Sequence, residues 1–127
     1  FGAQLVAVAC GGAIGATLRF TISAAMQKVA KGFPAGTMLV NVLGCLLLGL
    51  LLGATDDAKE LSPAARNFLT VGLLGSFTTF ATFSAEAIQL MRERQHAPVL
   101  IYVVGSVVLG LLCVLVGHEL AMKITRG

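Results

Sequence analysis

The chain has 127 residues, of which 57% are hydrophobic and only 12% are charged, with a formal net charge of +3. A soluble domain carries about twice that share of charged residues, so the composition excludes a soluble protein and indicates an integral membrane protein. We therefore expect membrane lipid as its surroundings and no nucleic-acid partner.

Four apolar segments follow one another along the chain. Each is long enough, as a helix, to cross about 30 Å of hydrocarbon, which takes about 20 residues. Arg19 is the only charged residue in the first segment, and the cores of the other three contain no Asp, Glu, Lys or Arg. Short polar connections leave no room for a second domain. We expect one all-α membrane domain over residues 1–127, with spans at about 4–26, 34–53, 63–91 and 98–121.

Prolines support these boundaries independently. Pro34, Pro63 and Pro98 each stand where a span would begin. Proline suits the first turn of a helix, because its missing N–H would have no partner there. Ser62, just before Pro63, is typical of a helix N-cap.

Two glycine pairs have the spacing that allows helices to pack closely in a membrane. Gly11 and Gly15 lie in the first span, and Gly49 and Gly53 in the second, each pair at GxxxG spacing. Small residues at this spacing let two backbones approach one another. We expect both pairs to lie in helix contacts.

Polar residues also occur inside the spans. Arg19 lies deep in the first span and Asn41 in the second, while Tyr102 and Ser106 stand four apart in the fourth. Polar groups at such depth are costly and indicate function. The alternative is that each forms an ordinary hydrogen bond between helices.

The third segment contains the sequence GLLGSFTTFATFSAE, from Gly72 to Glu86. Gly75 precedes a run of serine, phenylalanine and two threonines, which are weak helix formers and favour an interruption. An interruption frees backbone groups that must be satisfied inside a membrane, carbonyls by a cation or N–H groups by an anion. The alternative is an unbroken helix whose hydroxyls bond back to its own carbonyls.

Aromatic and hydroxyl side chains recur every three residues in this segment, which predicts two neighbouring stripes. The hydroxyl stripe runs towards Glu86 and indicates a polar path. Ring edges carry positive quadrupole charge and could face a small anion, although aromatic stripes in membranes also serve packing and lipid contact. The aromatic stripe comprises Phe77, Phe80 and Phe83, and the hydroxyl stripe Ser76, Thr79 and Thr82.

The basic residues outside the spans divide equally between the two sides of the membrane. An excess of Lys and Arg normally fixes orientation, so a tie predicts insertion both ways round, unless one local charge decides. Two opposite orientations lead to an antiparallel homodimer, with the symmetry of an inverted-repeat transporter. One side carries Lys28, Lys31, Arg92 and Arg94, and the other Lys59, Arg66, Lys123 and Arg126.

Neither a metal cluster of the usual ligands nor an enzyme is predicted. Cys10, Cys45 and Cys113 stand singly in three different spans, while His96 and His118 lie near span ends. An intramembrane enzyme would need a nucleophile with a base or a metal, and no histidine lies mid-span to serve.

Three ordered motifs together resemble one family. GGAIGATLRF from Gly11, NVLG from Asn41 and GLLGSFTTFATFSAE from Gly72 are similar to the Fluc (CrcB) fluoride channels of bacteria, and the resemblance covers all four spans. It implies a dual-topology antiparallel homodimer in the bacterial inner membrane, with two fluoride pores and a broken third helix. The implied function is passive export of toxic cytoplasmic fluoride.

The resemblance also implies a role for particular residues. A structural sodium ion at the dimer centre would be held by the backbone carbonyls of Gly75 and Thr78, and Phe80 and Phe83 would line the pores. Ala81 stands where many members of the family have serine. We expect the remaining pore residues to be Asn41, Thr79, Thr82, Ser84, Tyr102, Ser106, Arg19 and Glu86.

A small multidrug resistance transporter is the alternative, because it also has four spans and dual topology. Such a transporter needs a carboxylate within its first span to exchange protons for a cationic drug. Here the first span has Arg19 and no acid. A fluoride channel therefore fits the sequence better.

Overall fold

Helices make up all the regular structure in residues 1–126, the part of the chain that this computed structural model describes. α1 covers Gly2–Val29, α2 Ala35–Ala54 and α6 His96–Arg126. Each of the three, and the composite third span Pro63–Arg92, is long and apolar enough to cross a membrane. The prediction of an all-α membrane protein with four spans is confirmed.

The third span is built from four pieces. They are α3 (Pro63–Asn67), the π-helix η1 (Phe68–Leu74), α4 (Gly75–Phe77) and α5 (Phe80–Arg92). Thr78 and Thr79 between α4 and α5 are extended, with φ/ψ of −90°/160° and −153°/120°. The predicted interruption is therefore present, directly after the run of weak helix formers. The π-helix before it was not predicted.

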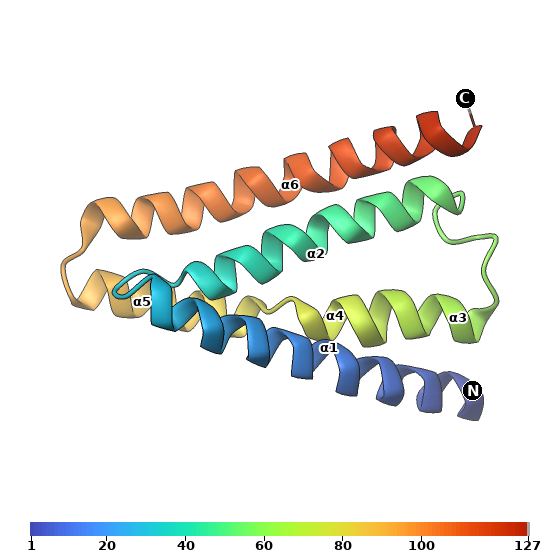
Figure 1. The fold of residues 1–127 in the computed structure, drawn as a ribbon, viewed down its shortest axis with the longest axis horizontal. Helices are drawn as coiled ribbons and strands as arrows, with labels where there is room; N and C mark the ends of the chain where they lie inside the picture. Colours follow the sequence, from blue (N-terminus) through green and yellow to red (C-terminus); the bar gives the residue numbers. More distant parts are fainter. Residues whose placement is uncertain (127) are drawn as a thin grey trace.

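The spans form two parallel pairs (Figure 1). α2 and α6 run side by side in one direction, and α1 and the first part of the third span run together in the other. Glycine makes both contacts close. A Cβ atom at Gly11 or Gly15 would collide with the backbone of η1, and one at Gly49 or Gly53 with the backbone of α6. The predicted packing role of these glycines is confirmed.

The third span changes its neighbour at the interruption. Its first part, from α3 to α4, packs along α1, whereas α5 packs on α6. Ala87 and Leu90 of α5 form a buried cluster with Val99 and Tyr102 of α6. Because α5 turns away from α1 towards α6, α1 and α5 diverge at that end of the bundle.

Capping side chains fix the ends of the pieces. The hydroxyl of Ser62 accepts a hydrogen bond from the N–H of Ala65 at 3.2 Å, so the predicted N-cap is confirmed. The hydroxyl of Thr79 accepts from the N–H of Thr82 at 3.3 Å and caps α5 in the same way. A helix can therefore restart inside the membrane with one of its open N–H groups satisfied.

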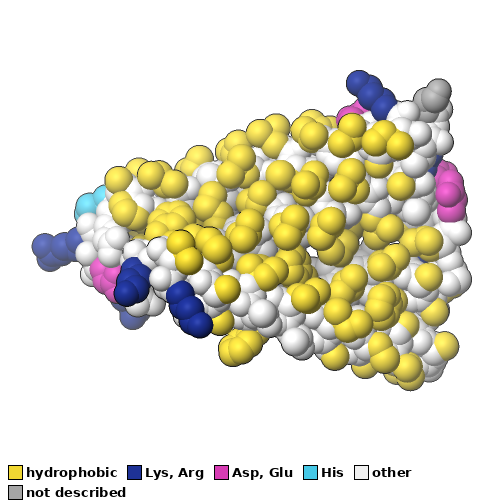
Figure 2. All heavy atoms as spheres, in the orientation of Figure 1, with side chains coloured by type: hydrophobic (Ala, Val, Ile, Leu, Met, Phe, Trp, Pro, Cys, Tyr) yellow, Lys and Arg dark blue, Asp and Glu magenta, His cyan; other side chains and the backbone are white. Residues whose placement is uncertain are grey.

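The surface has an apolar middle between two charged ends (Figure 2). Apolar side chains of α1 and α6 are widely exposed, including Phe20, Leu100, Ile101 and Leu111. Such continuous exposure is unsuited to water and suits contact with lipid or another protein in the membrane. Lys, Arg, Asp and Glu side chains gather beyond this band.

Candidate functional site

Two polar side chains of neighbouring spans, Asn41 and Arg19, form hydrogen bonds with the backbone at the interruption. The N–H of Thr79 donates to Oδ1 of Asn41 at 2.7 Å, and Nδ2 of Asn41 donates to the Thr79 carbonyl at 3.1 Å. From α1, Nε of Arg19 donates to the Ser76 carbonyl at 3.0 Å. Asn41 and Arg19 thus compensate backbone groups that the interruption leaves without helical partners.

Two backbone carbonyls at the interruption are left over. Among residues 1–126, neither the Gly75 carbonyl nor the Thr78 carbonyl accepts any of the hydrogen bonds that lie outside the regular helices. Gly75 is exposed on the surface of the chain, and both residues line a cavity. Neutral carbonyl oxygens near a protein surface, without a carboxylate beside them, are suitable ligands for a hard monovalent cation.

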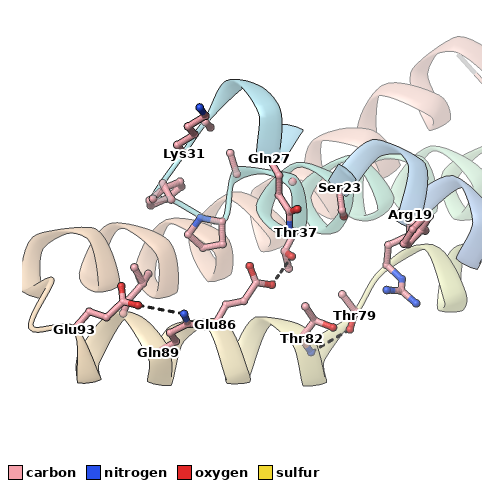
Figure 3. A pocket seen from close by; sticks show the side chains of 18 residues that line it. Arg19, Ser23, Gln27, Lys31, Thr37, Thr79, Thr82, Glu86, Gln89 and Glu93 are labelled. Atoms are coloured by element: carbon pink, nitrogen blue, oxygen red, sulfur yellow. Dashed lines mark hydrogen bonds between the residues drawn. The ribbon is translucent and has the colours of Figure 1, made fainter. Parts of the chain in front are cut away.

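A first cavity of about 550 Å³ lies where α1 and α5 diverge. α1 contributes Arg19, Ser23 and Gln27 to its wall, and α5 contributes Thr82 and Glu86. Figure 3 shows these side chains around the opening, with Glu86 pointing towards Thr37 of α2. The cavity therefore forms because the third span leaves α1 after the interruption.

Thr37 was missed by the sequence analysis. Its side chain is buried, and its hydroxyl donates to Oε1 of Glu86 at 2.6 Å. Thr37 precedes Asn41 by four residues, so the two share one face of α2, and that spacing could have identified it. The bond fixes the Glu86 carboxylate against the wall of the first cavity.

A second cavity of about 340 Å³ lies on the other side of the interruption. Thr79 lines both cavities, so they lie next to one another at the interruption. No Asp, Glu, Lys, Arg or His lines the second cavity within the described chain. The hydroxyl of Ser106 is buried there and has no hydrogen-bond partner among residues 1–126. The other residues around it include Asn41, Cys45, Leu48, Gly75, Thr78, Phe80 and Phe83.

Four aromatic rings form a continuous series beside the cavities. The ring centroids of Phe80 and Phe83 are 5.9 Å apart, those of Phe83 and Tyr102 5.1 Å, and those of Tyr102 and Phe33 5.7 Å. Tyr102 is fully buried and its hydroxyl has no hydrogen-bond partner among the described residues. Phe80, at the other end of the series, is 80% exposed. The exposed ring indicates a surface that lipid or a second protein covers.

The structure groups most of the expected site residues, but not all. Arg19, Thr79, Thr82 and Glu86 line the first cavity, and Asn41, Thr79, Phe80, Phe83 and Ser106 the second. Tyr102 lines neither cavity, and its ring instead packs against the ring of Phe83. Ser84 also lies outside both cavities, and its hydroxyl donates to the Phe80 carbonyl at 2.9 Å.

The predicted stripes are wrong as continuous features. Phe77 is buried at 5% exposure, whereas Phe80 is among the most exposed side chains. Likewise, the hydroxyl of Ser76 faces Gly12 of α1, while Thr79 and Thr82 face the first cavity. A three-residue period holds only within one helix, and the extended residues Thr78 and Thr79 end it.

Comparison with known proteins gives one consistent result. A family model described as "CrcB-like protein, Camphor Resistance (CrcB)" matches residues 6–118. The chain is similar to proteins named "Fluoride-specific ion channel FluC" from several organisms. The relative from Chloroflexus aurantiacus is 45% identical over 90% of this chain and 91% of its own length. The one from Shewanella halifaxensis is 44% identical over 91% and 94%, and the one from Methanopyrus kandleri 42% identical over 98% and 93%.

Proposed function

This chain belongs to the CrcB-like family, and from that premise we propose that it is a fluoride-specific ion channel. It is a multi-pass membrane protein, and a bacterial inner membrane suits it. The relatives named as fluoride-specific channels match nearly the whole chain, so the proposal applies to this entire four-span unit. The channel would let toxic fluoride leave the cytoplasm passively.

One observation carries the mechanism: uncharged donors with free hydrogens line two cavities that share Thr79. Asn41 uses one amide hydrogen on Thr79 and keeps the other. The Thr79 hydroxyl accepts from Thr82, so its own hydrogen is free, and the Ser106 hydroxyl has no partner in the described part of the chain. These groups can replace water around a small anion as it passes between the cavities.

Uncharged donors suit fluoride in particular. Fluoride is small and strongly hydrated, so a selective pore must be narrow and must offer short hydrogen bonds in place of water. A fixed cation would hold the ion too tightly for conduction. In the second cavity only neutral donors and the rings of Phe80 and Phe83 are available. Ring edges add weak positive potential without trapping the ion.

Of the two cavities, only the first is lined by charged groups among the described residues, and two of these groups, Arg19 and Glu86, have a neutral partner. Arg19 donates to the Ser76 carbonyl, and Glu86 accepts from Thr37. Their opposite charges offset one another at longer range. We propose that this cavity is the hydrated entrance, and that the uncharged second cavity selects the ion.

Two further parts of the proposal concern assembly. A second copy in antiparallel orientation would cover the exposed Phe80 and Gly75, and it would close the second cavity into a pore. The free carbonyls of Gly75 and Thr78 from both copies would then hold a structural sodium ion. That ion would supply positive charge to hold the two copies together at their interruptions.

Efflux from liposomes tests the function. Purified protein is reconstituted into liposomes loaded with potassium fluoride or chloride, a potassium ionophore lets potassium leave with the anion, and release is followed with ion-selective electrodes. We expect rapid fluoride release and chloride release no faster than from protein-free liposomes. Equal rates for the two ions would refute selectivity. Uptake of a cationic dye driven by a proton gradient would instead indicate a multidrug transporter.

A further inference from the structure

Two cysteines lie in the same contact between α2 and α6. The two helices run in parallel with a constant register, because Gly49 contacts the backbone of Val114 and Gly53 that of His118. In this register Gly110 lies opposite Cys45, four residues before Val114. Cys113 follows Gly110 by three residues, so it is on the same face of α6, one turn further along. Both thiols are free and half-buried.

The missing side chain of Gly110 leaves an open position beside Cys45. A Cβ atom at Gly110 would be 3.4 Å from Sγ of Cys45 and would meet no side-chain atom of Cys113 within 4 Å. Side chains on a helix lean towards its N-terminus, so the Cys113 side chain leans back along α6 towards Gly110. The open position at Gly110 therefore borders the Cys45 sulfur and lies on the face of α6 that also carries Cys113.

We propose that Cys45 and Cys113 form a binding site for a single thiophilic metal ion, of the class of mercury(II) or silver(I). Soft thiolate sulfur favours soft ions over the hard ions that carbonyls and carboxylates bind. Such ions are satisfied by two sulfur ligands on opposite sides, so two cysteines suffice without a third ligand. With mercury(II), each thiol loses its proton, two S–Hg bonds form and two protons are released.

The position of Cys45 makes the metal site accessible from the second cavity. For the same reason, a bound metal ion would affect that cavity. Cys45 lines the second cavity and lies one turn from Asn41 on α2. An ion entering that cavity reaches the first sulfur directly. Once bound, the ion occupies part of the wall of the cavity that Phe80 and Phe83 also line, and it obstructs whatever passes there.

Mercuric chloride is the probe, and binding is measured on the full chain in detergent by mass spectrometry after alkylation of remaining thiols. We expect one mercury per chain, with the loss of two protons and one thiol still open to alkylation. Cys10→Ser is the matched control, because Cys10 lies on the exposed face of α1 and lines neither cavity. This variant should bind mercury as wild type does and leave no thiol to alkylate.

The two site variants should behave alike. Cys45→Ser and Cys113→Ser each remove one sulfur, and we expect affinity to fall by more than about 100-fold, beyond the loss that follows removal of a supporting group around a metal. Gly110→Ala keeps both thiols but fills the open position beside Cys45. Its Cβ stands at ordinary contact distance from Cys45, so the variant should fold and still bind mercury less tightly.

Several results would overturn the proposal. Unchanged affinity in Cys113→Ser would mean that Cys45 binds alone, and loss of binding in Cys10→Ser would place the metal elsewhere. Mercury that joins two chains covalently would also contradict a site within one chain. Binding needs no transport assay, so this test is independent of the proposed channel function. Fluoride efflux, if present, should be blocked by mercury in wild type and in Cys10→Ser, but not in Cys45→Ser.

Discussion

Asn41 and Thr79 exchange two hydrogen bonds, in which Thr79 N–H donates to Oδ1 of Asn41 at 2.7 Å and Nδ2 of Asn41 donates to the Thr79 carbonyl at 3.1 Å. A single side chain therefore replaces both backbone partners that an unbroken helix would have given the N–H and the C=O of Thr79. The same amide reaches the second cavity. Asn41 both stabilises the interruption and offers a donor beside it.

Asn41→Asp should impair both roles. The carboxylate cannot donate to the Thr79 carbonyl, and the unpaired group should lower the free energy of unfolding by about 1–3 kcal/mol. Its negative charge also repels an anion in a setting of low dielectric. We expect fluoride efflux to fall by about tenfold or more, equivalent to about 1.4 kcal/mol. Liposome efflux and thermal unfolding in detergent measure the two effects.

Asn67→Asp is the matched control for this change. Asn67 lies at the end of α3, lines neither cavity, and its side chain donates to Oε1 of Gln4 at 3.0 Å. It should lose some stability but keep its fluoride efflux. If both aspartate variants conducted equally well, Asn41 would have no special place in the pathway.

Thr37 should matter through its hydroxyl. Thr37→Val keeps the shape but removes the donor to Glu86, and a hydrogen bond to a charged group contributes about 1.5–3 kcal/mol. We expect lower thermal stability and lower efflux, because the freed carboxylate can turn its charge into the first cavity. Thr37→Ser restores the donor and should recover most of both losses. Equal behaviour of the valine and serine variants would show that the hydrogen bond is unimportant.

Phe80 and Phe83 should be needed for flux more than for folding. Replacement of either with isoleucine keeps apolar bulk and removes the ring edge, so efflux should fall by about tenfold, or about 1.4 kcal/mol at the constriction. Phe80→Ile should leave the stability of a single chain unchanged, because the ring is 80% exposed. Phe1→Ile, at an exposed ring outside both cavities, is the control. Normal efflux in both site variants would assign the rings to packing alone.

Gly44 and Thr78 offer a test of the sodium proposal. A Cβ atom at Gly44 would collide with the methyl group of Thr78, so Gly44→Ala must displace the residue whose carbonyl is the proposed ligand. We expect this variant to need about tenfold more sodium for dimer stability or efflux, a change of about 1.4 kcal/mol. Thr78→Ser removes the methyl group and should be mild alone.

The double variant gives the sharper result. Gly44→Ala combined with Thr78→Ser removes the collision, so the two changes should be non-additive and sodium dependence should return towards wild type. Replacement of sodium by a bulky organic cation should weaken the wild-type dimer. If it changes neither assembly nor efflux, the free carbonyls at Gly75 and Thr78 hold no functional ion.

The sequence was sufficient for features that depend on local chemistry. Apolar length predicted the four spans, Ser62 its N-cap, and the weak helix formers after Gly75 the interruption. The sequence was not sufficient for features that depend on contacts between two spans. The π-helix Phe68–Leu74 lies where Gly11, Gly15 and Gly72 bring two backbones together, and no periodicity within the third span reports that contact.

The same distinction between local chemistry and contacts between spans applies to the functional site. Asn41 and Arg19 were identified because polar groups inside a membrane are rare, but their partners, the backbone of Thr79 and Ser76, required the fold. Ser84 was expected in the pore, yet its hydroxyl bonds to the turn before it. A serine in a helix can donate its hydroxyl to the backbone carbonyl four residues earlier, and only the structure shows which serine does so.

The third span changes its packing partner at Thr78 and Thr79, and these two residues therefore form a hinge. α3 to α4 pack on α1, and α5 packs on α6, so each half of the third span is held by a different neighbouring helix. The helical ladder is already open between them, and bending there breaks no further helical hydrogen bond. Any flexing of the bundle should therefore concentrate at these two threonines, where the cavities meet.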